Sequence, residues 1–182
     1  MKIWRIHPDP DRYRSVSPLE MTPSETVDLK SRFGAGTPIG AMWQPIRVSL
    51  FQYEGEDRKP MGDFPSFGGV VPLIISKMAL DALLPLIGAD VEPLDLTTDF
   101  GPYLALNVFA RDCLDLSKTE FKRFKSGRIR GVEHYVFRND HLEGHHIFRL
   151  PQEIMSRIFA DTSFKEAVES HGLQGLHFDE IP

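Results

Sequence analysis

The sequence predicts an α+β fold, with a mixed, mainly antiparallel sheet and a few short helices packed on it. The chain has 182 residues, of which 41% are hydrophobic, so it can bury a core of its own. Its 14 glycines and 14 prolines indicate many turns and disfavour an all-helical bundle. The helices and strands expected along the chain do not alternate regularly, which disfavours a doubly wound α/β fold.

The first elements are short and are separated by loops rich in proline and glycine. Residues 2–7 and residues 46–53 alternate in polarity, which predicts two strands. Ser24 and residues 27–33 predict a short helix between them. Residues 70–75 form a continuous apolar run that predicts a buried strand.

A better-defined helix follows this run. Ser76 can cap its start, and one inward face is predicted by apolar residues at helical spacing: Ala79, Leu80, Leu83 and Leu84. Pro85 has no N–H to donate to residue 81, and its ring clashes there. We therefore expect the helix to end or kink near Leu84.

The second half of the chain is predicted to consist mainly of strands, at residues 91–96, 103–109, 132–138, 146–150, 157–160 and 173–178. Residues 117–130 are basic and are expected to be mobile, whereas residues 139–144 are expected to form a turn. Ser163 and Glu166 have the spacing of a capping box at the start of a terminal helix, and Gly172 is placed to end that helix.

The stretch "HLEGHHIFRL" (141–150) raises the question of a metal site. His141 and His145 have the H-x-x-x-H spacing that, on a helix, places both imidazoles on one face. Gly144 and the apolar segment after it indicate a turn and a strand instead. A metal would need a third ligand, which His134 or a neighbouring carboxylate could supply only if the fold brought it close. We expect exposed turn histidines, and the alternative is a metal-dependent hydrolase that uses His134, His141 and His145.

Other catalytic signals are weak. Cys113 lies beside Asp112 and Asp115, which would raise its pKa, so we expect a free structural thiol and no nucleophile. The sequence contains no G-x-S-x-G elbow. The glycines of "GAGTPIG" (34–40) fit neither a dinucleotide fingerprint nor a phosphate loop. We therefore expect no cofactor.

The charge and the hydropathy limit the partners and the location. A net charge of −5 disfavours a nucleic-acid binder, although the basic residues 118–130, with Phe121 and Phe124 between them, are a feature that would favour one. No apolar run approaches the roughly 20 residues that span a bilayer, and the N-terminal residues lack the apolar core of a signal peptide. The single cysteine excludes an intrachain disulfide. We expect a cytoplasmic protein without nucleic-acid or membrane partners.

Five segments share their order and spacing with a known family. They are "DFPSFGG" (63–69), a strand–helix unit (70–96), "YLALNV" (103–108) with a Leu-Asp soon after it, "HIFRL" (146–150), and a terminal helix ending in "GLQGLHF" (172–178). In these segments the chain resembles a family of bacterial immunity proteins. Members of that family are encoded beside polymorphic or contact-dependent toxins, including those delivered by type VI secretion. The resemblance covers about residues 60–182.

The resemblance implies a function without catalysis: stoichiometric binding of a cognate bacterial effector toxin, which is thereby neutralised in the cytoplasm. A regulatory or assembly module with another partner remains an alternative. Because motif residues suit the core, we expect toxin contacts on loops. Acidic residues steer a basic partner and aromatic residues anchor an interface, which suggests Glu54, Glu56, Asp57 and Phe67 as contacts.

The resemblance also suggests how the chain is organised. We expect an N-terminal strand-and-loop region over residues 1–60, which could form a small subdomain, and an immunity-type α+β domain over residues 61–182. The oligomeric state stays open at this point.

Overall fold

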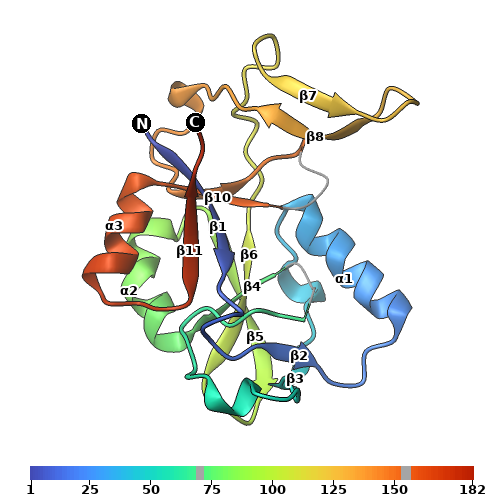
Figure 1. Cartoon of the computed structure of the whole chain (residues 1–182), viewed down its shortest axis with the longest axis vertical. Coiled ribbons are helices and arrows are strands. Elements are labelled where there is room, and N and C mark those ends of the chain that lie inside the picture. The colour runs from blue at the N-terminus through green and yellow to red at the C-terminus, as the bar shows by residue number, and fades with distance from the viewer. Residues whose placement is uncertain (69–71, 153–156) are drawn as a thin grey trace.

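A computed structural model describes residues 1–68, 72–152 and 157–182, and within them it contains three α-helices and 11 strands (Figure 1). The strands form a four-stranded sheet, a five-stranded sheet and a two-stranded hairpin. The predicted α+β class is confirmed. The sequence predicted one sheet, whereas the strands form three. Strand pairing depends on contacts between residues distant in sequence, which local patterns do not reveal.

The four-stranded sheet joins the two ends of the chain. Its strands lie in the order β11-β1-β10-β9, and every pair is antiparallel: β1 (Ile3–Pro8), β9 (Ile147–Arg149), β10 (Ile158–Asp161) and β11 (Leu176–Glu180). Because β1 lies between β10 and β11, both termini emerge at the same end of the sheet (Figure 1).

The five-stranded sheet is mixed. Its order is β2-β3-β5-β6-β4, with the strands β2 (Val16–Pro18), β3 (Ile46–Leu50), β4 (Leu73–Ser76), β5 (Val91–Thr98) and β6 (Tyr103–Val108). The pair β3 and β5 is parallel and the other pairs are antiparallel. Residues before position 60 thus contribute strands to both larger sheets, and the division of the chain near residue 60 stays a prediction. Of the strand predicted at 70–75, residues 70 and 71 lie outside the described residues.

The basic segment forms a hairpin. Strands β7 (Glu120–Arg123) and β8 (Ile129–His134) pair antiparallel, within and beside the segment 117–130 for which the sequence predicted mobility and no regular structure. Phe121 lies opposite Val132, and both pack in a core cluster with Phe148 and Phe159. This burial fixes the base of the hairpin on the body of the protein.

Three α-helices cover the sheets: α1 (Pro23–Ala35), α2 (Lys77–Ile87) and α3 (Thr162–Ser170). Helices α2 and α3 lie together on one side of the molecule, and α1 lies on the other side (Figure 1). One core cluster lies between α2, α3 and the neighbouring strands, and a second lies beneath α1, around Phe33 and Val48. Within the described part of the chain, no helix has both the length and the apolar character needed to cross a membrane.

The helix caps confirm some predictions and correct others. Ser76 caps α2 as predicted, accepting the N–H of Ala79 at 3.1 Å. Helix α1 begins earlier than predicted, with Thr22 and Glu25 forming a capping box. In α3 the predicted capping box of Ser163 and Glu166 is wrong. Asp161, the last residue of β10, accepts the N–H of Phe164 at 2.9 Å and starts the helix two residues earlier.

Pro85 does not end α2. The helix continues to Ile87, and the N–H of Gly88 still donates to the carbonyl of Leu84 at 2.9 Å. Leu83 and Ile87 are fully buried in the core cluster between α2 and α3. We attribute the last turn to this burial, which offsets the hydrogen bond that proline removes.

Candidate functional site

The histidine-rich stretch is attached to the body by two carboxylates. His145 Nδ1 lies 2.5 Å from the Oδ1 of buried Asp90, and His146 Nδ1 lies 3.0 Å from the Oδ2 of Asp161. Asp90 also accepts the backbone N–H of His146 at 2.8 Å. Because a buried carboxylate needs several donors, these contacts have a structural explanation: they hold the turn before β9 in place.

The three histidines of the metal hypothesis have separate environments. His145 contacts Asp90, His141 Nδ1 lies 3.1 Å from the carbonyl oxygen of Asp112, and His134 is an exposed residue of β8 opposite Glu120. No group of three His, Cys, Asp or Glu side chains in the described ranges is placed to hold a metal ion. The described residues therefore lack the cluster that the hydrolase alternative requires.

Cys113 is a buried thiol whose surroundings disfavour the thiolate. Burial raises its pKa to about 12, and the negative charge of Asp112 adds to that increase. A thiol with such a pKa stays protonated at neutral pH and is a poor nucleophile. This environment agrees with the structural role predicted for Cys113.

The family-like motifs meet around Asp63. Its Oδ2 accepts the N–H of Gln174 at 2.9 Å, and its own N–H donates to the carbonyl of Gln174 at 2.8 Å. Its Oδ1 accepts the hydroxyl of Ser76 at 2.7 Å. One carboxylate thus joins "DFPSFGG", the start of α2 and the loop before β11.

Gly175 completes this junction. Its φ is +106°, and a Cβ at this position would come within 3.3 Å of the backbone N and O of Phe64. Phe64 itself is buried in the core, as are Ile147 and Phe148 of "HIFRL". These motif residues build the scaffold.

The predicted contact residues occupy two different environments. Glu54 and Asp57 are exposed, whereas Glu56 and Phe67 are buried, with only 7% and 3% of their surface accessible. Phe67 packs beneath α1 and its backbone bridges that of Val16. Phe67 therefore supports the loop region from inside and presents no aromatic surface to a partner.

Glu56 is the internal anchor of residues 51–58, which we name the aromatic–acidic loop. Its carboxylate accepts the N–H of Ser15 at 2.9 Å and forms an ion pair with Lys59. Lys59 also donates to the carbonyl of Pro10 at 2.7 Å. Burial alone would raise the pKa of Glu56, but the hydrogen bonds from Lys59 and Ser15 and the nearby positive charges lower it below its usual value. The carboxylate is therefore charged and fixes the loop at neutral pH.

Two exposed aromatic residues of this loop were not predicted as contacts. Tyr53 is 73% exposed and Phe51 is 41% exposed, and their rings stack with centroids 6.4 Å apart. The predicted strand at 46–53 would have included both residues, but β3 ends at Leu50. Aromatic residues immediately before the acidic, glycine-containing "EGED" were the signal that could have identified them.

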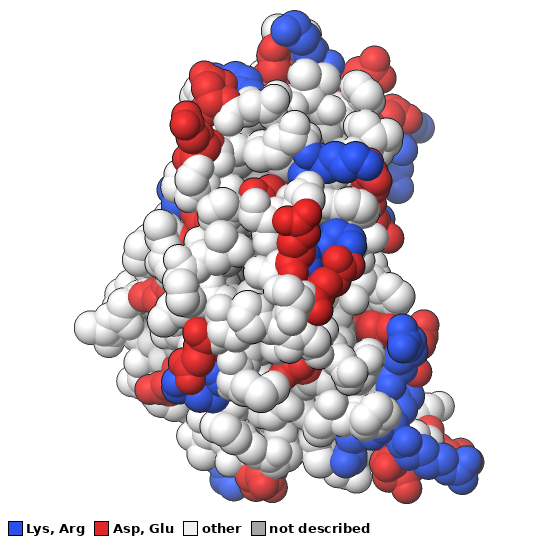
Figure 2. Space-filling model, turned by 90° about the vertical axis from the view of Figure 1, so that its left-hand side faces the viewer, with Lys and Arg blue, Asp and Glu red and all other residues white. Residues whose placement is uncertain are grey.

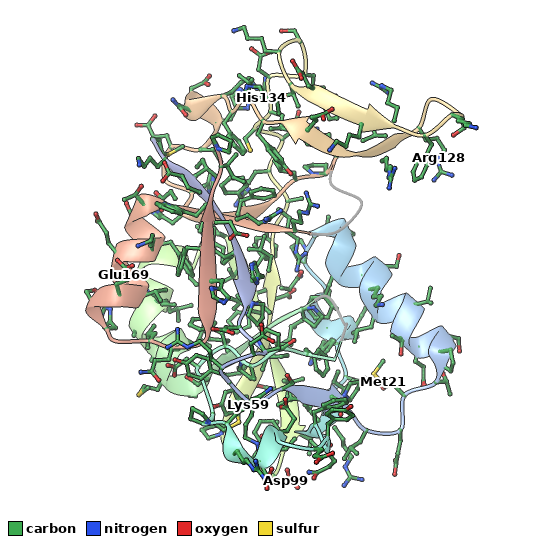
Figure 3. All side chains as sticks on the ribbon, in the orientation of Figure 1. Met21, Lys59, Asp99, Arg128, His134 and Glu169 are labelled. Atoms are coloured by element: carbon green, nitrogen blue, oxygen red, sulfur yellow. The ribbon has the colours of Figure 1, made fainter. Side chains whose placement is uncertain are left out.

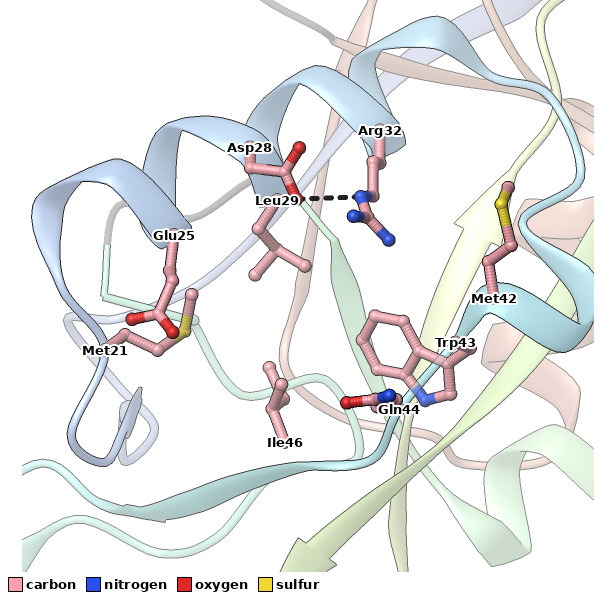
Figure 4. Close-up of a pocket in the computed structure, with 9 residues that line it drawn as sticks. All are labelled: Met21, Glu25, Asp28, Leu29, Arg32, Met42, Trp43, Gln44 and Ile46. Carbon is pink, nitrogen blue, oxygen red and sulfur yellow. Dashed lines mark ion pairs between the residues drawn. The ribbon is translucent and has the colours of Figure 1, made fainter.

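A second surface feature is a groove of about 330 Å³ between α1 and the segment before β3 (Figure 4). Leu29 and Trp43 contribute apolar surface, and an ion pair of 2.8 Å between Asp28 and Arg32 lies along α1. The Trp43 Nε1–H already donates to the carbonyl of Asp95 at 2.8 Å. The groove offers apolar surface that an apolar side chain could occupy.

The face formed by α2 and α3 has a different character. Figure 2 shows acidic and basic side chains interspersed over it, without a field of one sign. Such mixing is typical of a solvated surface, so this face offers little to steer a charged partner.

Comparison with known proteins gives a match to a protein family. No curated protein matches the chain. Residues 102–182, which extend from β6 to the end of the chain and contain "YLALNV", "HIFRL" and "GLQGLHF", match the model of the immunity protein family Imm11, and this confirms the resemblance to an immunity protein family over that part of the chain.

Proposed function

We propose that the protein is an immunity protein that binds a cognate secreted bacterial toxin and neutralises it as a stoichiometric complex in the cytoplasm of the producing cell. The observation that carries the proposal is the match of residues 102–182 to the immunity protein family. The toxin would belong to a type VI or polymorphic toxin system. Neutralisation by binding alone requires no catalytic residues on this chain.

The aromatic–acidic loop is the surface that we assign to the toxin. Tyr53 and Phe51 offer exposed aromatic area, and aromatic side chains are enriched among the residues that dominate binding energy. Glu54 and Asp57 are exposed beside them and would steer a basic partner. Glu56 and Phe67, which the sequence suggests as contacts, would act from beneath the surface by fixing the loop.

This loop suits tight binding because it is ordered by the rest of the protein. The N–H of Phe51 donates to the carbonyl of Ser15 at 2.9 Å, and the carboxylate of Glu56 accepts the N–H of Ser15. A loop held in this way loses little conformational entropy on association. A standard interface buries about 800 Å² on each partner, so neighbouring surface must contribute as well.

The test is coexpression with the toxin encoded by the neighbouring gene. The toxin should kill cells when expressed alone, and wild-type protein should protect them and copurify with it. A variant with Tyr53→Ala, Glu54→Ala and Asp57→Ala should bind about 30-fold more weakly or worse. The reason is that truncating a hot-spot residue costs about 2 kcal/mol of binding free energy or more. The acidic substitutions should also lower the association rate and its dependence on salt.

A matched control uses exposed residues outside the loop: Met78→Ala, Glu143→Ala and Glu166→Ala. This variant should bind as the wild type does. If wild-type protein neither protects nor copurifies, the immunity assignment is wrong. If the loop variant matches the control, the immunity assignment stands and the assignment of this loop fails.

A further inference from the structure

The β7–β8 hairpin extends away from the body of the protein (Figure 1). Figure 3 labels Arg128 near its outer end and His134 near the body. Its turn has three residues, Lys125 to Gly127, closed by the N–H of Phe124 on the carbonyl of Arg128 at 2.9 Å. Gly127 has a φ of +82°, the conformation that such a turn requires. The tip is therefore a defined turn, while Phe121 and Val132 anchor the base.

The charge of the hairpin is opposite to that of the rest of the chain. Residues 117–134 contain six Lys or Arg and two Glu, a net charge of +4, whereas the whole chain carries −5. The other 164 residues therefore carry −9. Salt screens exposed charges from one another beyond about 8 Å at physiological ionic strength. The positive potential near the tip of the hairpin is therefore set mainly by the hairpin itself.

The outer cations of the hairpin differ from those at its base in their ion pairs. Lys118 pairs with Asp115 and Lys122 pairs with Glu133 near the base. The four remaining cations are exposed and form no ion pair with a carboxylate of the described residues: Arg123, Lys125, Arg128 and Arg130.

Aromatic rings position two of the guanidinium groups. Arg130 lies over Phe124 at 5.9 Å from the ring centroid, and Arg123 lies over Phe121 at 5.8 Å. Phe124 is 48% exposed beside the turn. Arginines held against rings are suited to bidentate contacts with carboxylates, and the exposed ring can anchor the same contact.

We propose that the β7–β8 hairpin is a docking arm that enters an acidic cleft of the toxin, with its outer cations facing carboxylates and Phe124 as the apolar anchor. This inference rests on the proposed function and adds a second contact of opposite charge. The hairpin and the aromatic–acidic loop lie at opposite ends of the molecule (Figure 1), so separate parts of the toxin would contact them. Contacts so far apart should contribute additively to binding.

A nucleic acid is the less favoured partner for this arm. Duplexes and single strands present phosphates along their whole length, and a body of net charge −9 would repel them as the hairpin approached. An acidic cleft in a protein is confined, so a narrow projection can reach it without bringing the anionic body against like charge.

The test measures binding of the full-length protein to the purified toxin. The variant Lys125→Glu/Arg128→Glu changes only exposed residues near the turn. We expect its association rate to fall about tenfold or more, together with the dependence of that rate on salt. Phe124→Ala should raise the dissociation rate about fivefold or more, as loss of an aromatic anchor does.

The matched control is Lys30→Glu/Arg47→Glu, which changes the net charge equally at two other exposed cations and should alter the rates less than twofold. Circular dichroism should show the same folded spectrum for each variant. If the wild type binds the toxin and the hairpin variant binds equally well, the docking arm is wrong and the immunity function stands. If the wild type does not bind the toxin, both the docking arm and the immunity function are wrong.

A second measurement addresses nucleic acid. A 20-nucleotide single strand and its duplex are titrated with wild-type protein at about 150 mM salt, where we expect no measurable binding. Tight binding that the Lys125→Glu/Arg128→Glu variant loses would overturn the proposal and assign the hairpin to nucleic acid.

Discussion

Gly175 and Asp63 show how single residues of the motifs maintain the junction between distant segments. Asp63 receives donors from Gln174 and Ser76, and Gly175 allows the backbone of Phe64 to approach closely. Both residues make their contacts inside the protein. The spacing of these motifs is explained by packing.

The substitution Gly175→Ala should destabilise the protein by about 3 kcal/mol. A side chain at φ +106° is strained, and its Cβ would meet backbone atoms of Phe64 at 3.3 Å. Gly172→Ala is the control, since Gly172 has a φ of +65° and open space around it, and should cost about 1 kcal/mol. Urea unfolding measures both. Equal losses would show that the close approach at Gly175 has no energetic effect.

Predictions for single residues succeeded where the determinant is local. Gly172 adopts the left-handed conformation expected after a helix, and Ser76 caps the helix that follows it. The cap of α3 failed because Asp161 belongs to β10, where it lies opposite Ile3. The end of that strand is set by residues far away in the sequence, which spacing alone does not reveal.

At the scale of elements, α2 contains the clearest conflict between local preference and packing. Pro85 is exposed within a helix whose opposite face is buried. Pro85→Ala should restore the N–H that can donate to residue 81 and should stabilise the protein by about 1–2 kcal/mol, after allowance for the greater freedom of the unfolded chain. Thermal unfolding would measure the gain. A loss of stability would mean that the proline ring is required for packing.

The hairpin illustrates what the sequence leaves undetermined in an element. Residues 117–130 show few apolar side chains and many charges, which favoured a mobile segment. The base of the hairpin is stabilised by a cluster that contains Ile3, Phe148 and Phe159, all distant from it in sequence. Strand partners such as β1 with β10 were hidden for the same reason, because pairing depends on the whole fold.

At the scale of the whole molecule, several carboxylates should make stability depend on pH. Burial alone would raise the pKa of Glu92, but donors from Ile39, Asn107 and Gly40 lower it. Glu56 is lowered as described above, and the Ser117 and Lys118 side chains lower the pKa of Asp115 to about 2. Each folded-state pKa lies below its unfolded value of about 4, so these groups stabilise the protein at neutral pH.

Their contribution should be lost as pH falls from about 4.5 through the folded-state values. Urea unfolding between pH 7 and pH 2.5 should show a steady fall in the free energy of unfolding. Glu92→Gln should lower the free energy of unfolding by about 1–2 kcal/mol at pH 7. The free energy of unfolding of this variant should fall less steeply toward low pH than that of the wild type. Constant stability down to pH 3 would contradict these pKa directions.

The candidate binding surface was predicted in part. Glu54 and Asp57 lie on the surface of an acidic loop, as the sequence suggested. Nothing in the sequence distinguished them from Glu56, because its burial depends on Ser15 and Lys59. Tyr53 was missed because alternation continued past the point where β3 ends.

The central claim is neutralisation by stoichiometric binding, and a titration tests it most directly. The activity of the purified toxin is measured against increasing amounts of this protein, at a toxin concentration well above the dissociation constant of the complex. The account predicts a linear fall that reaches zero at one equivalent, with a complex of matching composition on size-exclusion chromatography. Full inactivation by a small fraction of an equivalent, without a complex, would show that the protein acts as a catalyst and would contradict the account.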